Sequence, residues 1–128
     1  MDFPEDLYYT EEHEWIAPSE DGTSARVGIT DFAQRELGDI VFVELEPTDT
    51  ELAQEAPFGT VEAVKTVSDL YMPVSGILRA HNERIEDHPE LVNDDPYGEG
   101  WMIEVELTDP DELEGLMEAA SYRSMVGE

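Results

Sequence analysis

The chain contains no cysteine and only one lysine, Lys65, among its 128 residues. Without cysteine it has no disulfide, no thiolate nucleophile and no cysteine-bound zinc. No apolar run approaches the roughly 18 residues that a membrane-spanning helix needs. The acidic N-terminal stretch has neither the basic nor the apolar segment of a secretory signal. We therefore expect a cytoplasmic protein that does not enter a membrane.

Basic residues are also scarce, because 6 of them stand against 33 acids and give a formal net charge of −27. A field of this sign repels phosphate backbones and argues against nucleic acid as a partner. The acids are scattered along the chain, which favours adaptation to a salt-rich cytoplasm, as in a halophile, over a cationic partner. On this interpretation the melting temperature rises between low and molar KCl.

Short segments with an apolar period of two dominate the chain and predict half-buried antiparallel strands. In the segment 39–46 this pattern places Val41, Val43 and Leu45 on one face, and in the last segment it turns Met102 outward. The predicted strands cover residues 13–17, 25–30, 39–46, 59–64, 67–72, 77–80 and 101–107.

Two helices interrupt the strands. A capping box that starts at Asp31 predicts a short helix ending at Gly38. A second helix is predicted to begin at Asp109 and to carry one apolar face, formed by Leu113, Leu116, Met117 and Ala120. We expect one domain over residues 1–128, mostly β, built as a sandwich or flattened barrel with a short helix and a covering C-terminal helix.

Lys65 lies with Thr66 between two strand-like runs and is therefore predicted at the exposed tip of a tight hairpin. Three uses of such a lysine remain open: a solvated charge, a Schiff-base nucleophile, or an attachment point for a cofactor that must travel. The nucleophile is disfavoured because Glu62 and Asp69 stabilise the charged amine.

The stretch GTVEAVK (59–65), followed by SDLYMPVSG (68–76), resembles the lipoylation hairpin of the glycine cleavage system H proteins. Further stretches are similar to the same family in the same order: HEW (13–15), GITDFA (28–33), LGDIVFVEL (37–45), PELVN (89–93), DPYGEGW (95–101) and DEL (111–113). The resemblance implies a barrel-sandwich hybrid fold of the lipoyl- and biotinyl-carrier type. It also implies lipoate in amide linkage on Lys65, and a carrier rather than an enzyme.

The resemblance also implies partners and site residues. The partners are the glycine decarboxylase (P protein), the aminomethyltransferase (T protein), the dihydrolipoamide dehydrogenase (L protein), and a lipoate ligase or lipoyl synthase. Glu14 and Asp69 match the positions that contact the aminomethyl cargo. Glu12 stands where relatives often have a hydroxyl residue, and it is a third candidate.

Two other functions stay open at this point: a lipoyl or octanoyl relay outside glycine cleavage, and a biotinyl carrier. The biotinyl carrier is disfavoured because Val64 and Thr66, rather than two methionines, flank the lysine. No metal site is expected, since the three histidines lack ligand spacing: His13, His81 and His88.

Overall fold

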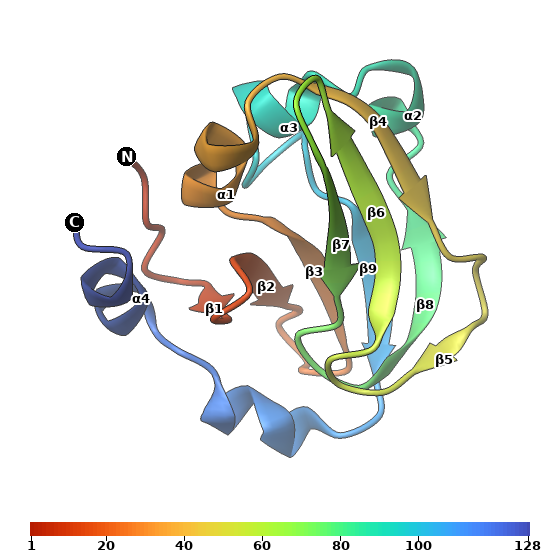
Figure 1. Cartoon of the computed structure of the whole chain (residues 1–128). Helices are drawn as coiled ribbons and strands as arrows, with labels where there is room; N and C mark the ends of the chain where they lie inside the picture. The colour runs from red at the N-terminus through yellow and green to blue at the C-terminus, as the bar shows by residue number, and fades with distance from the viewer.

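The fold consists of two antiparallel sheets, seen in a computed structural model that describes all 128 residues (Figure 1). The larger sheet has six strands in the order β1-β2-β3-β9-β8-β5. Its strands are β1 (Tyr8–Tyr9), β2 (Glu14–Pro18), β3 (Ser24–Ile29), β9 (Ile103–Leu107), β8 (Gly76–His81) and β5 (Glu51–Leu52). The two-residue strands β1 and β5 were not predicted, because two residues are too few to show an alternating pattern.

The smaller sheet has three strands in the order β4-β6-β7, namely β4 (Ile40–Leu45), β6 (Pro57–Ala63) and β7 (Val67–Tyr71). Strands β6 and β7 form the hairpin that carries Lys65. The Ala63 amide donates to the Thr66 carbonyl over 2.8 Å, so Val64 and Lys65 lie at the tip. The prediction of Lys65 and Thr66 at the tip was therefore wrong by one residue.

The facing sides of the two sheets enclose a core of 18 buried residues, among them Phe58, Val61 and Leu78. A second cluster of Tyr9, Trp15, Ala119 and Tyr122 lies on the far side of β1 and β2. None of the helices has the length and apolarity to cross a membrane. The mostly β sandwich expected from the alternating segments is therefore observed.

The first helix, α1, spans Asp31–Leu37 and ends at Gly38, which has φ 81°. Its N-cap is Thr30 and not Asp31, since the Thr30 hydroxyl accepts from the Ala33 amide over 3.1 Å. Asp31 instead accepts from the Gln34 side chain, within the first turn. The prediction was one residue late because Thr30 and Asp31 are both good capping residues.

The predicted C-terminal helix is in fact two helices. A 3-10 helix, η1 (Pro110–Gly115), gives way to extended backbone at Leu116, and α4 (Ala119–Met125) follows. Between them Met117 pairs with Tyr9, which extends the sheet at β1. Leu113 and Leu116 therefore pack on the main core, Met117 packs on the second cluster, and Ala120 is exposed. In Figure 1, α4 lies beside β1, away from the three-stranded sheet.

Two strand faces also differ from the alternation. A bulge between Ile40 and Phe42 turns Val41 toward solvent, where 46% of it is exposed. Met102 is buried just before β9, where its amide donates to the Val27 carbonyl over 2.8 Å, so the period of two fails at the start of this segment. Two short helices were not predicted, α2 (Arg84–Asp87) and α3 (Leu91–Asp94).

Candidate functional site

Lys65 lies at the hairpin tip with its side chain exposed. The tip is fixed by backbone contacts, since the Val64 amide donates to the Asp39 carbonyl over 3.1 Å. A Cβ atom added to Gly38 would lie 3.3 Å from Cε of Lys65, so the lysine chain passes directly over this glycine. The turn between α1 and β4, formed by Gly38 and Asp39, thus contacts both the backbone of the hairpin tip and the Lys65 side chain.

The segment beneath the lysine is held in turn by Asn93 of α3. The Asn93 side chain donates to the Gly38 carbonyl over 2.9 Å and accepts from the Ile40 amide over 2.9 Å. The sequence analysis did not single out Asn93 for this role. No local pattern marks it, because its partners Gly38 and Ile40 lie 55 and 53 residues away in the sequence.

Lys65 is the one basic side chain that forms no ion pair or cation–π contact. Four arginines pair with carboxylates, namely Arg26, Arg35, Arg79 and Arg84. Arg26 also lies over the ring of Trp101, and Arg123 lies over the ring of Phe3. Neither Glu62 nor Asp69, the two carboxylates expected beside it, forms an ion pair with this amine. The amine is therefore exposed and held by no partner side chain.

A cleft of about 390 Å³ lies between α1 and the β6–β7 hairpin, and we call it the helix cleft. Its wall includes Leu37, the residue before Gly38, so the lysine side chain lies next to one end of it. Apolar side chains line much of the cleft: Ile29, Phe32, Ala33, Leu37, Val61 and Leu70. Such a lining suits an aliphatic arm.

The three predicted cargo contacts, Glu12, Glu14 and Asp69, all line this cleft. Asp69 and Glu12 are exposed, whereas Glu14 is only 2% exposed. Burial raises the pKa of Glu14 to about 8, with a further small rise from Glu12. The cleft thus combines an apolar wall with carboxyl groups, an arrangement that fits an aliphatic chain ending in an ammonium ion.

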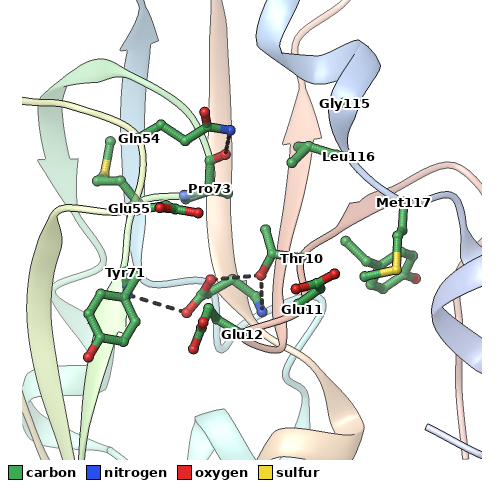
Figure 2. Close-up of a pocket in the computed structure, with 13 residues that line it drawn as sticks. Thr10, Glu11, Glu12, Gln54, Glu55, Tyr71, Pro73, Gly115, Leu116 and Met117 are labelled. Carbon is green, nitrogen blue, oxygen red and sulfur yellow. Dashed lines mark hydrogen bonds between the residues drawn. The ribbon is translucent and has the colours of Figure 1, made fainter. Parts of the chain in front are cut away.

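Glu14 is held by two donors. The Thr10 hydroxyl donates to Oε1 over 2.8 Å, and the Tyr71 amide donates to Oε2 over 3.3 Å (Figure 2). Both bonds lower the pKa of Glu14 and oppose part of the effect of burial. The sequence analysis missed Thr10, because a hydroxyl four residues before Glu14 is no pattern in a strand.

His13 shapes the turn that presents Glu14. It has φ 69°, and its Nδ1 lies 2.8 Å from the Tyr122 hydroxyl. The Thr30 hydroxyl lies 2.7 Å from the same Tyr122 oxygen, so α4 is tied both to this turn and to the start of α1. Burial lowers the pKa of His13, which favours the neutral ring.

Comparison with known proteins agrees with this geometry. The sequence profile of the family described as Glycine cleavage H-protein matches residues 7–128. The chain belongs to this family. A glycine cleavage system H protein of Salinibacter ruber is 66% identical over 122 residues, which are 95% of this chain and 97% of the relative. Another, from Chlorobium limicola, is 56% identical over 128 residues and covers 100% of both chains.

The crystal structure of a glycine cleavage system H protein from Mycobacterium marinum is similar to this fold, with a TM-score of 0.87 and 38% identity. The match covers 98% of this chain and 99% of that one. The predicted barrel-sandwich hybrid fold is thereby confirmed. So is the prediction that this chain is a non-catalytic carrier in glycine cleavage.

Proposed function

We propose that Lys65 carries the lipoyl group in amide linkage, and that a lipoate ligase or a lipoyl synthase pathway installs it in the cytoplasm. One observation carries the proposal: the only lysine of the chain is exposed and unpaired at the hairpin tip, next to one end of an apolar cleft. When bound, this cofactor supplies a thiol that carries a one-carbon amine between the P and T proteins and is reoxidised by the L protein.

The chain's own residues then bind and shield the cargo. The apolar wall of the helix cleft excludes water from an aliphatic chain. At the carboxyl groups, Glu14 and Asp69 accept hydrogen bonds from the cargo ammonium ion, and Glu12 adds negative charge nearby. An opposite charge within about 4–6 Å favours the protonated amine, so these groups hold the cargo in its charged form.

The attachment is tested by intact mass in cells that lipoylate other proteins. The unaltered chain gains one lipoyl adduct, and trypsin fails to cleave after residue 65. Lys65→Arg keeps the positive charge but gains no adduct, since a guanidinium does not form this amide. A matched control combines Lys65→Arg with Arg26→Lys, which moves the sole lysine to an exposed position on β3. We expect no adduct on the moved lysine. An adduct there, or an unmodified wild-type chain, contradicts the proposal.

The cargo contacts are tested on the loaded carrier alone. The rate at which the aminomethyl group is lost to water rises in Glu14→Gln and in Asp69→Asn, because each variant removes a negative charge from the cleft. Glu20→Gln removes the same charge from an exposed turn outside the cleft and leaves the rate unchanged. Equal rates in all three variants would argue against an amine site at Glu14 and Asp69.

A further inference from the structure

Glu14 lies in the wall between two clefts. The helix cleft lies on one side, and on the other is a cleft of about 290 Å³ between β7 and η1, which we call the Thr10 cleft (Figure 2). Glu12 and Glu14 are the two residues that line both. Thr10 lines only the Thr10 cleft, where its hydroxyl is bonded to the Glu14 carboxyl group. Glu14 therefore separates the two clefts, and both of its carboxyl oxygens are bonded to residues of the Thr10 cleft, Thr10 and Tyr71.

No cation neutralises Glu14 in this position. The titratable groups that line the two clefts beside it are Tyr9 from β1, Glu11, Glu12 and His13 from its own loop, Asp69 and Tyr71 from β7, Glu36 from α1 and Glu55 from the loop before β6, and Tyr122 of α4 is close enough to interact with its charge. Five of these nine groups are carboxylates, and burial lowers the pKa of His13 away from the charged form. A buried acid in such surroundings keeps its proton near neutral pH.

Thr10 is bonded to Glu14 in both directions. Its hydroxyl donates to Oε1 over 2.8 Å and accepts from the Glu14 amide over 3.2 Å. The Thr10 amide also donates to the Glu14 carbonyl over 3.0 Å. These three bonds fix the carboxyl group relative to its own backbone.

We propose that Thr10 is a positioning residue, which holds the Glu14 carboxyl group so that it releases one proton when a cationic amine enters the helix cleft. In this step the O–H bond of Glu14 breaks, the proton passes to water in the Thr10 cleft, and the carboxylate pairs with the ammonium ion. Charge balances, because one positive charge enters the cleft and one leaves. This proposal rests on the amine site proposed above.

The role of Thr10 is tested by the titration of Glu14, followed by carbon-13 NMR of the side-chain carboxyl group in the lipoylated, empty carrier. Thr10→Val keeps the shape of the residue and removes the donor. We expect the Glu14 midpoint to rise by roughly one pH unit, since a hydrogen bond to a charged group is lost. Thr10→Ser restores the donor and returns the midpoint. Equal midpoints in Thr10→Val and the unaltered chain overturn the positioning role.

The proton release is tested on the same carrier loaded with the aminomethyl group. We expect the Glu14 midpoint to fall by about 1–3 pH units, as for a carboxyl group beside a fixed cation. Near neutral pH, loading then releases up to one proton, measurable in weakly buffered solution. The release shrinks above the midpoint of the empty carrier, where Glu14 is already ionised.

Failures of the two proposals give different results. If loading leaves the carboxyl resonance of Glu14 unchanged in both position and midpoint, the amine does not reach Glu14, and the proposed amine site fails with this inference. If loading shifts the resonance at high pH but leaves the midpoint unchanged, the amine site stands and the proton release is overturned.

Discussion

Two regions of the molecule are supported in opposite ways: the hairpin tip at Lys65, or lysine end, and the surroundings of the buried Glu14 carboxyl group, or Glu14 end. Lys65 is exposed, forms no ion pair, and depends on backbone contacts beneath the tip. Glu14 is buried and is bonded to Thr10 and Tyr71, and its loop is tied to α4 through His13. Under the proposed functions, a lysine that meets several enzymes is left free, whereas a carboxyl group that meets one ligand in a fixed geometry is held. Substitutions at the two ends should therefore differ in cost.

The largest effect is expected on the Glu14 side, in Tyr122→Ala. Tyr122 is fully buried, stacks on Tyr9 with centroids 4.8 Å apart, and lies within hydrogen-bond distance of His13 and Thr30. Removing a buried aromatic side chain costs about 3–5 kcal/mol. Chemical denaturation should show this loss. Tyr122→Phe, which keeps the stacking and removes the hydroxyl, should lose less. Equal losses would mean that stacking contributes nothing here.

The next effect depends on pH. The pKa of Glu14 is about 8 in the fold, above its ordinary value of 4.5, because burial disfavours the charged form. Between these values the folded chain holds a proton that the unfolded chain has lost, so Glu14 reduces stability as pH rises. Glu14→Gln removes this dependence.

The measurable quantity is the difference in unfolding free energy between Glu14→Gln and the unaltered chain. It should shift in favour of the variant from about pH 5 to pH 8, with a slope approaching about 1.4 kcal/mol per pH unit. Taking the difference cancels the other carboxyl groups, including Asp31, whose pKa is lowered by its hydrogen bonds from Gln34 and Asp2 despite burial. A flat difference would show that Glu14 is ionised in the fold throughout this range.

Gly38 connects the two ends, because it closes α1 and lies beneath the lysine chain. Gly38→Ala forces an L-residue to φ 81° and places its Cβ 3.3 Å from Cε of Lys65. We expect a loss of about 1–3 kcal/mol, because φ 81° with ψ −157° is a backbone conformation that glycine alone adopts readily, and a slower acylation of Lys65. Gly22→Ala is the matched control, with φ 72° and nothing within 4 Å of the added Cβ. It should show the stability loss with no change in acylation.

The sequence predicted the lysine end better than the Glu14 end. Alternation and the two flanking runs place Lys65 on a hairpin, because these are local patterns within one sheet. The bond from Thr10 to Glu14 also joins residues close in sequence, but it depends on a turn at His13. His13 has a left-handed backbone, and no glycine or asparagine at this position indicated such a turn. The tie to Tyr122 spans 109 residues. The split of the C-terminal helix follows from the pairing of Met117 with Tyr9, a tertiary contact that overrides an apolar stripe.

The smallest effect is expected at Lys65 itself. Lys65→Met keeps an unbranched side chain of similar length and removes the charge. Since no carboxylate pairs with this amine and the side chain is exposed, the unfolding free energy should change by less than about 0.5 kcal/mol. The matched control is Arg79→Met, which breaks ion pairs to both Asp49 and Glu106. Each variant removes one positive charge from a chain of net charge −27, so the general repulsion rises equally. Denaturation at one salt concentration should find Arg79→Met the less stable of the two. The reverse order would mean that Lys65 stabilises the tip, and that the two ends are built alike.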